Sequence, residues 1–214
     1  MLTVHHLGVS QSERIVWLCE ELEIPYELKR YERDSGMGLA PAAYKTLHPV
    51  GTAPIITDDE TALAESGAII EYIIARHGGG RLAVGPDAPN FADYLFWFHF
   101  ANGSMMPRMV VDYFLSTALP KDSDHPAAIM FRTRVSEAFS LIEDRLGKAL
   151  YFAGDAFTAA DIIMLFPLTT IRALLPRDLT PYPHLLAYLQ RIGARPAFQR
   201  AMRKADPDLP PQLT

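Results

Sequence analysis

The pattern of the chain changes near residue 80, and this change constrains the fold more than any other feature. Before it, short strand-like and helix-like stretches alternate, and after it the strand patterns fade and long helical patterns follow. The chain has 214 residues, enough for two small domains with separate cores. We therefore expect an α/β N-terminal domain over residues 1–79, a linker over 80–88 and an all-α domain over 89–214.

The first part alternates in a defined order. Strand patterns cover residues 2–7, 26–31, 54–57 and 61–64, and helical patterns cover 11–22, 42–47 and 66–76. A right-handed crossover makes the first two strands parallel, and a turn at residues 58–60 makes the last two an antiparallel hairpin. The predicted order is β-α-β-α-β-β-α.

The second part predicts helices only. A long helical pattern spans residues 90–119, and Pro107 should kink or break it. Residues 130–146 place their apolar side chains in one stripe, and residues 159–175 are almost wholly apolar, as in a buried helix. Shorter helical patterns cover 185–192 and 197–203.

Composition excludes several classes of protein. The net charge is −5 and no basic stripe appears, which argues against a nucleic-acid partner. No window approaches eighteen apolar residues, and residues 1–9 lack the features of a secretory signal. The single cysteine, Cys19, fits a reducing compartment and an inert core position, and the histidines lack metal-ligand spacing. We expect a cytoplasmic protein with no metal and no membrane partner.

Ser10 lies between the first strand pattern and the first helical pattern. Open α/β sheets bind ligands at this end of their strands, and a helix N-terminus favours anions. A hydroxyl here can donate a hydrogen bond to a bound thiolate and lower the pKa of that thiol. However, Ser10-x-x-Glu13 also has the form of a capping box, and Ser12 is a competing hydroxyl.

Two further motifs permit both a structural and a binding interpretation. Pro54 opens a strand pattern after Gly51-Thr52-Ala53, which suggests either a tight turn or a cis-proline that leaves the backbone of Ala53 free to pair with an extended peptide. Glu65-Ser66 begins a helical pattern, where Ser66 either caps the helix or helps to bind a carboxylate beside an ammonium held by Glu65.

Thr158-Ala159-Ala160-Asp161 precedes the buried helical pattern. A threonine followed three residues later by an acid is a capping box, in which each side chain bonds the backbone N–H of the other's segment. We expect this motif to stabilise the fold rather than to take part in chemistry.

Together and in this order, these motifs resemble the glutathione S-transferase family over nearly the whole chain. The resemblance rests on Ser10-x-x-x-Arg14, Gly51-Thr52-Ala53-Pro54, Glu65-Ser66 and Thr158-Ala159-Ala160-Asp161. It implies a thioredoxin-like N-terminal domain that binds glutathione and an all-helical domain that contributes the electrophile site. It also implies a homodimer.

The resemblance assigns roles residue by residue. Ser10 would be the catalytic hydroxyl on the glutathione sulfur, Ala53 would pair with the cysteinyl unit beside cis-Pro54, and Glu65 and Ser66 would bind the γ-glutamyl group. Arg14 would support the first helix, and Asp161 would be a fold-stabilising cap. The implied glutathione-binding residues are Ser10, His48, Thr52, Ala53, Pro54, Glu65 and Ser66.

The sequence departs from the family pattern at two positions. Family members often carry a lysine where Thr52 stands, so His48 or Lys45 would replace its contact with the glycine carboxylate. They often carry an acid near Asn102, where the amide would weaken any contact made by charge. The implied electrophile pocket comprises Phe100, Asn102, Met105, Met106 and Met109, although the methionines equally fit a core.

The implied reaction is attack of the glutathione thiolate on a small hydrophobic electrophile, as in detoxification, with glutathione as co-substrate. Glutathione-dependent peroxide reduction, dehalogenation and isomerisation would fit the same residues. The alternative is a non-catalytic protein of this fold, used for interaction or for ligand binding. Retention of Ser10, Pro54, Glu65 and Ser66 favours the enzyme.

Overall fold

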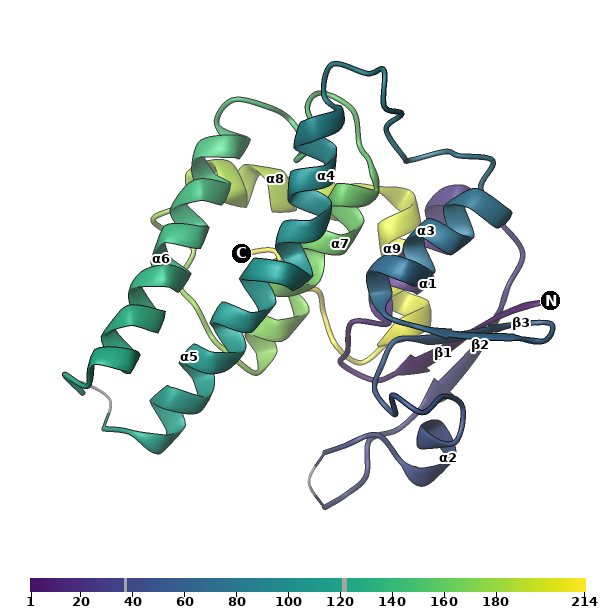
Figure 1. Ribbon diagram of the computed structural model, residues 1–214, viewed down its shortest axis with the longest axis horizontal. Coiled ribbons are helices and arrows are strands. Elements are labelled where there is room, and N and C mark those ends of the chain that lie inside the picture. The colour runs from purple at the N-terminus through teal and green to yellow at the C-terminus, as the bar shows by residue number, and fades with distance from the viewer. Residues whose placement is uncertain (37, 121–122) are drawn as a thin grey trace.

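The structure is a computed structural model that describes residues 1–36, 38–120 and 123–214. Within these ranges, four strands form one mixed sheet in the order β2-β1-β3-β4 (Figure 1). They are β1 (Leu2–Leu7), β2 (Glu27–Tyr31), β3 (Ile55–Asp58) and β4 (Thr61–Ala64). β1 and β2 are parallel, and β3 is antiparallel to both β1 and β4. The predicted thioredoxin-like order is confirmed.

Helices cover both faces of this sheet. α1 (Glu13–Leu22) and α3 (Ser66–Arg76) contact one another on one face, and the short α2 (Ala42–Lys45) lies on the other. The alternation of β1 supplies both cores, since Val4 joins the α1 side and Leu7 packs with Tyr44 of α2. His5 and His6 consequently project to opposite faces of the sheet.

The rest of the described chain is helical, as predicted. Its elements are α4 (Phe91–Phe100), a π-helical segment (Ala101–Met105), α5 (Met106–Ala118), α6 (Pro126–Leu146), α7 (Ala159–Leu168), a 3-10 segment (Thr170–Ala173), α8 (Pro183–Gly193) and α9 (Pro196–Ala205). No helix in the described ranges is long and apolar enough to span a bilayer.

Prolines interrupt two of the predicted helical patterns: the interruption at Pro107 is as predicted, whereas the one at Pro167 was not predicted. Pro107 cannot donate the hydrogen bond that a regular turn requires, and the pattern predicted over 90–119 passes through a π-helical segment before it. The helix predicted over 159–175 ends at Leu168, one residue after Pro167. The 3-10 segment that follows redirects Ile171 and Leu174.

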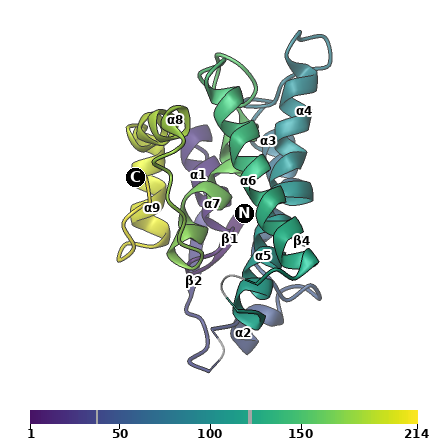
Figure 2. The same ribbon diagram turned by 90° about the vertical axis from the view of Figure 1, so that its left-hand side faces the viewer.

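The two parts of the molecule meet along α1. α7 is wholly buried and contacts both α1 and α4, and α9 lies beside α1 (Figure 2). Ion pairs reinforce the second contact: Glu20 pairs with Arg200 at 3.0 Å and with Lys204, and Glu21 pairs with Arg195 at 2.7 Å. The helical part therefore holds the helix that follows Ser10.

The predicted capping box at Thr158 is confirmed. The Thr158 hydroxyl accepts from the Ala160 N–H, and the Asp161 carboxylate accepts from the Thr158 N–H at 2.9 Å. Asp161 also accepts from the Phe152 N–H at 2.9 Å and from the Tyr188 hydroxyl at 3.2 Å. Asp161 therefore connects the start of α7 to two other segments.

Candidate functional site

Ser10 lies at the wall of a cavity of about 630 Å³ between the sheet and the helical part. The loop from β1 to α1 turns through Val9, whose φ of +52° is unusual for a side chain other than glycine. The turn leaves Ser10 6% exposed, with its hydroxyl donating to the Leu7 carbonyl at 2.6 Å.

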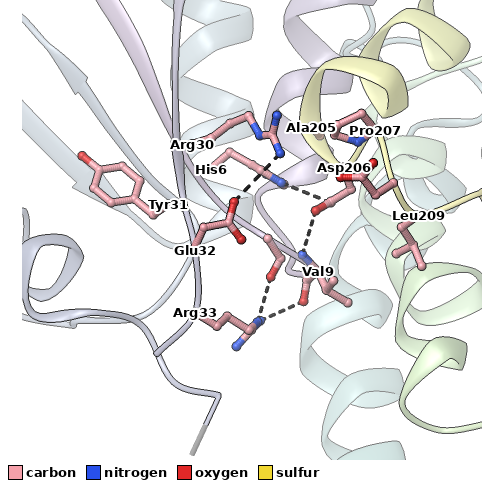
Figure 3. A pocket seen from close by; sticks show the side chains of 12 residues that line it. His6, Val9, Arg30, Tyr31, Glu32, Arg33, Ala205, Asp206, Pro207 and Leu209 are labelled. Carbon is pink, nitrogen blue, oxygen red and sulfur yellow. Dashed lines mark hydrogen bonds and ion pairs between the residues drawn. The ribbon is translucent and has the colours of Figure 1, made fainter. Parts of the chain in front are cut away.

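Side chains from distant segments hold this loop (Figure 3). Arg33 donates to the carbonyls of Gly8 and Val9, each at 2.8 Å. Asp206, just after α9, accepts from the Val9 N–H at 3.1 Å and contacts His6 at the same distance. The loop that carries Ser10 is thereby held by Arg33, which follows β2, and by Asp206, which follows α9.

The prediction of a capping box at Ser10 is wrong. α1 begins at Glu13, its N-cap residue Ser12 makes no side-chain cap, and Glu13 accepts a 2.5 Å hydrogen bond from Thr170 instead of bonding the loop backbone. Glu13 is buried, and burial raises the pKa of its carboxyl to about 8.

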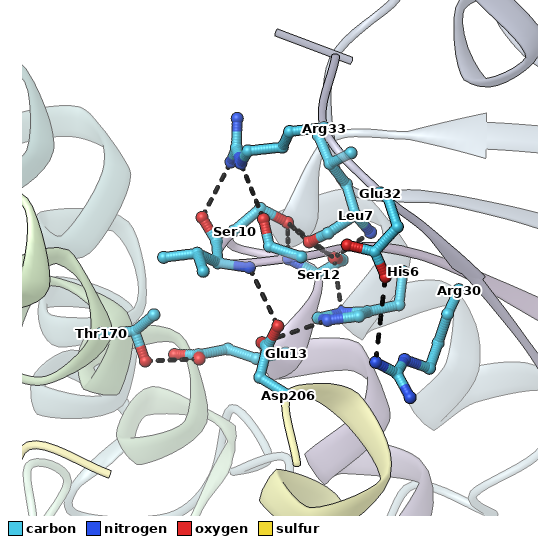
Figure 4. Close-up of polar contacts among 12 residues, drawn as sticks. His6, Leu7, Ser10, Ser12, Glu13, Arg30, Glu32, Arg33, Thr170 and Asp206 are labelled. Carbon is cyan, nitrogen blue, oxygen red and sulfur yellow. Dashed lines mark hydrogen bonds and ion pairs between the residues drawn. The ribbon is translucent and has the colours of Figure 1, made fainter. Parts of the chain in front are cut away.

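Ser12, the competing hydroxyl, is fully buried and does not line the cavity. Its oxygen accepts from the Leu7 N–H at 3.1 Å and lies 2.9 Å from His6 Nδ1 and 2.7 Å from the Ser10 oxygen (Figure 4). Of the two serines, Ser10 is the one that a molecule in the cavity would meet.

The peptide bond between Ala53 and Pro54 is cis, as predicted for a binding edge. Ala53 lines the large cavity together with Ser10, and it also lines a second cavity of about 360 Å³. Gln11, Thr52 and Met106 likewise line both cavities. The two cavities therefore adjoin, and together they form an elongated site with Ala53 at its middle.

Ser66 and Glu65 line the second cavity. The cap predicted for Ser66 is wrong, because Glu65 precedes the helix with φ +71° and Ser66 is its first residue. The Ser66 hydroxyl oxygen accepts from Arg14 Nη1 at 3.1 Å and from the Asn102 amide at 2.8 Å. Since both lone pairs are occupied, its one hydrogen is free to be donated to an anion in the cavity.

Arg14 gives this cavity a positive charge. It is 1% exposed, and burial lowers its pKa to about 9, so it remains charged at neutral pH. Asn102 accepts from it at 3.0 Å, where an acid would have neutralised it. Within the described ranges, Nε and one terminal nitrogen of Arg14 have no hydrogen-bond partner. An anion beside Ser66 would be attracted by the charge of Arg14.

At the other end of the site, Arg33 and Lys45 line the large cavity. His48 does not line it, and its Nδ1 accepts from the Val50 N–H at 3.2 Å within a turn. Of the two substitutes considered for the lysine missing at Thr52, the structure brings Lys45 to the site. Arg33 was missed, because no motif distinguishes a basic residue in a polar loop.

The five residues expected around an electrophile are not all brought together. Met106 lines both cavities and Asn102 the smaller one, whereas Met109 lines a different cavity, and Phe100 and Met105 line neither cavity of the site. The apolar lining of the cavity that holds Ser10 is formed instead by Val9, Leu39, Met106, Phe166, Ile171 and Leu174. Ile171 and Leu174 were missed because the sequence predicted an unbroken helix there.

Two other sequence expectations concern reactive groups. Cys19 is fully buried on α1, and burial raises the pKa of its thiol far above the usual range, as expected for an inert core residue. Among the residues that the structure describes, no group of three or more histidine, cysteine or acidic side chains could hold a metal ion.

Comparison with known proteins agrees with this geometry. The model of the glutathione S-transferase N-terminal domain matches residues 5–81, and that of the C-terminal domain matches residues 105–196. Glutathione S-transferase 3 of Schizosaccharomyces pombe is 33% identical over 96% of this chain and 88% of its own length. The chain belongs to the glutathione S-transferase family.

Solved structures give the same assignment. A glutathione S-transferase from Actinobacillus pleuropneumoniae superposes with a TM-score of 0.85 at 32% identity, covering 96% of this chain and 93% of its own. A theta class glutathione S-transferase from Xanthomonas axonopodis, solved with glutathione bound, has a TM-score of 0.70 at 26% identity, covering 94% and 96%. This glutathione S-transferase therefore has relatives in bacteria and fungi.

Proposed function

We propose that this protein is a glutathione transferase that ionises the glutathione thiol at Ser10 and directs it at a small hydrophobic electrophile. Residues 1–79 form the glutathione-binding domain, 80–88 a linker, and 89–214 the helical domain that supplies much of the electrophile site. The observation that carries the proposal is the position of Ser10 at the wall of the cavity that Ala53, next to cis-Pro54, also lines.

The elongated site has the charges that an extended glutathione requires. Its γ-glutamyl ammonium fits beside the Glu65 carboxylate, and its α-carboxylate fits beside the free Ser66 hydrogen and the charge of Arg14. Its cysteinyl backbone pairs with Ala53, and its glycine carboxylate fits toward Lys45 and Arg33. In this placement the sulfur lies beside Ser10.

The hydroxyl is sufficient for the required activation. A free thiol with a pKa near 8.5 is only a few per cent ionised at neutral pH, and lowering that pKa by about two units requires roughly 2.7 kcal/mol. A hydrogen bond to a charged acceptor contributes about 1.5–3 kcal/mol. The apolar wall that includes Phe166 and Ile171 then holds the electrophile near the thiolate, and proximity lowers the barrier further.

The test is a titration of bound glutathione, following ultraviolet thiolate absorbance against pH. In the wild type, we expect the bound thiol to ionise at least about one pH unit below free glutathione. Ser10→Ala should lose this shift, and Ser10→Thr, which keeps a hydroxyl, should retain much of it. Turnover of an activated aryl halide should follow the same order.

Each alternative gives a different result in this titration. An unchanged shift in Ser10→Ala would remove Ser10 from the proposed role. Binding with an ordinary thiol pKa in the wild type would favour a ligand-binding protein. Absence of glutathione binding would favour an interaction protein of the same fold.

We further propose that the enzyme is a homodimer. Exposed apolar side chains lie along α4 and α5, namely Leu95, Phe96, Val110, Tyr113 and Phe114. In water these side chains favour association with another apolar surface. Sedimentation should give twice the mass of the 23.9 kDa chain, and a monomer at micromolar concentration would contradict this proposal.

We also place the enzyme in the cytoplasm, because the one cysteine is unpaired and buried and the reaction requires reduced glutathione. Fractionation of cells that express the protein should recover it with cytoplasmic markers.

A further inference from the structure

A continuous chain of polar contacts leads from the cavity into the protein behind Ser10 (Figure 4). The Ser10 and Ser12 oxygens are 2.7 Å apart, Ser12 lies 2.9 Å from His6 Nδ1, and His6 Nε2 lies 3.1 Å from Asp206 Oδ2. Of these four side chains, Ser10 alone lines the large cavity, whereas Ser12 and His6 are at most 1% exposed. This series of contacts has one end at the cavity and the other at the Asp206 carboxylate, whose side chain is 14% exposed.

The direction of these hydrogen bonds depends on the number of protons on His6. Asp206 only accepts, so His6 Nε2 must carry a hydrogen. If the imidazole is neutral, Nδ1 accepts from Ser12, and Ser12 in turn accepts from Ser10. In this arrangement, the Ser10 hydrogen lies between the Ser12 oxygen at 2.7 Å and the Leu7 carbonyl oxygen at 2.6 Å, and it points into the protein and away from the cavity.

If His6 carries a second proton, Nε2 still donates to Asp206, but the bonds from His6 to Ser12 and from Ser12 to Ser10 both reverse. Nδ1 donates to Ser12, Ser12 donates to Ser10, and the Ser10 hydrogen must find another acceptor. The Leu7 carbonyl, 2.6 Å away, is one such acceptor, and a thiolate in the cavity would be a stronger one. Ser10 can therefore stabilise a thiolate best when His6 is an imidazolium.

We propose that Ser12, His6 and Asp206 form a proton relay that ionises glutathione through Ser10, an inference that rests on the proposed function of Ser10. The S–H bond breaks as its proton passes to Ser10, the Ser10 proton passes to Ser12, and the Ser12 proton passes to His6 Nδ1. The products are a thiolate and an imidazolium. The transfer itself reverses the chain, so Ser10 then donates to the thiolate that it has helped to form.

Asp206 places a carboxylate oxygen 3.1 Å from Nε2 of buried His6. Burial acts to raise the pKa of Asp206, but the hydrogen bonds from His6 and from the Val9 N–H contribute to a net lowering of this pKa. Asp206 therefore remains a carboxylate at neutral pH. His6 and Asp206 line a separate cavity of about 340 Å³ together with further charged side chains (Figure 3). Glu13 also lies near Asp206 (Figure 4). The charged side chains around His6 are Glu13, Arg30, Glu32, Arg33, Asp206 and Asp208.

Ser12, His6 and Asp206 do not touch the sulfur, so they act as positioning residues for Ser10. The arrangement shares its serine, histidine and acid with the triad of hydrolases, but its serine passes a proton instead of attacking a carbonyl. It predicts a property that a purely structural role would lack: the thiol proton stays on the protein after ionisation.

Calorimetry in buffers of different ionisation enthalpy counts the protons released when glutathione binds. We would measure it alongside thiolate absorbance, at a pH where NMR shows His6 neutral in the free enzyme. The wild type should form thiolate and release almost no proton. His6→Gln keeps an amide for Asp206 but cannot accept a proton. It should raise the bound thiol pKa by about one unit or more, and any thiolate that forms should release about one proton.

The matched control is His5→Gln, since His5 is equally buried in β1 but faces Tyr31 and Thr57 on the other side of the sheet. It should behave as the wild type in both measurements. Ser12→Ala interrupts the relay and also removes the acceptor of the Leu7 N–H at the end of β1. It should reproduce His6→Gln in both measurements even if that variant folds poorly.

Two results would overturn the relay. One is release of about one proton per thiolate by the wild type at this pH, and the other is an unchanged thiol pKa in both His6→Gln and Ser12→Ala. If Ser10→Ala abolishes the pKa shift while these variants keep it, the role of Ser10 survives and only the relay fails. If Ser10→Ala also keeps the shift, the proposed function of Ser10 fails with it.

Discussion

The starts of α1 and α7 carry the same sequence pattern and use it differently. Ser10-x-x-Glu13 and Thr158-x-x-Asp161 each place a hydroxyl three residues before an acid at a helix start, and both acids are buried. At α7 the pair forms a capping box with reciprocal hydrogen bonds. At α1 the acid turns to Thr170 and the serine turns to the cavity.

The difference shows that a capping pattern specifies a cap only when the surrounding structure leaves the side chains no better partners. Asp161 has three backbone or side-chain donors within 3.2 Å, all from segments that it holds together. Glu13 has one, and its second oxygen has no partner among the described residues. Asp161 therefore stabilises the fold, whereas Glu13 is an incompletely satisfied buried acid next to the Ser10 site.

The largest expected effect is that of Asp161→Ala. It leaves the N–H groups of Phe152 and Thr158 unsatisfied in the interior, and we expect a loss of about 3 kcal/mol in the free energy of unfolding. Burial raises the Asp161 pKa to about 6, so wild-type stability falls as pH rises from about 4 to 6. Urea unfolding at pH 4.5 and 7.5 should therefore show the larger loss at pH 4.5. A loss below about 1 kcal/mol at both would contradict the network.

Glu13→Gln should increase the free energy of unfolding, whereas Asp161→Ala should decrease it. The pKa of Glu13 is raised to about 8, so the native state binds more protons than the unfolded state between about pH 4.5 and 8. Wild-type stability is therefore lost as pH rises through this window, by at most about 1.4 kcal/mol per pH unit. At pH 8 the variant should be more stable than the wild type by about 2 kcal/mol. Glu137→Gln, on the exposed face of α6, is the control, and equal pH profiles for all three proteins would refute the assignment.

Thr158→Ala tests the hydroxyl of the genuine capping box. Its oxygen accepts from the Ala160 N–H, and its hydrogen is donated to Asp161. Loss of such a cap costs about 1–2 kcal/mol, and we expect this decrease in the free energy of unfolding from urea titration. A neutral substitution would mean that Asp161 alone secures the start of α7.

Ser10→Ala should have the smallest effect on stability and the largest on chemistry. Its hydroxyl donates to a carbonyl that Ser12 also approaches, at 3.4 Å, so removal should cost about 0.5 kcal/mol. Thermal unfolding should be nearly that of the wild type while thiolate formation is lost. A stability loss as large as that of Thr158→Ala would make Ser10 a structural residue.

Local patterns predicted most of the fold. Strand β4 and helix α3 have the predicted bounds, because their patterns end at clear turn residues. The wall of the large cavity was less predictable, since Ile171 and Leu174 reach it only because α7 stops after Pro167. A single proline in an apolar run does not reveal where the next residues will point.

The polar surroundings of Ser10 were beyond sequence patterns for a different reason. His6 and Asp206 are 200 residues apart, and Arg33 reaches the loop from the end of β2. No spacing rule connects such residues, because tertiary packing alone brings them together. Ser10 itself was predictable because the end of a strand and the start of a helix are local features.

The distance along the chain between His6 and Asp206 has a consequence for biosynthesis. Protein domains fold as units while the N-terminal part emerges first from the ribosome. The sheet that carries His6 can form early, but Asp206 becomes available only after α9 has been made. In a nascent or prematurely terminated chain, His6 would therefore lack Asp206, its acidic partner. If the relay operates, the ability to ionise glutathione appears only near the end of synthesis.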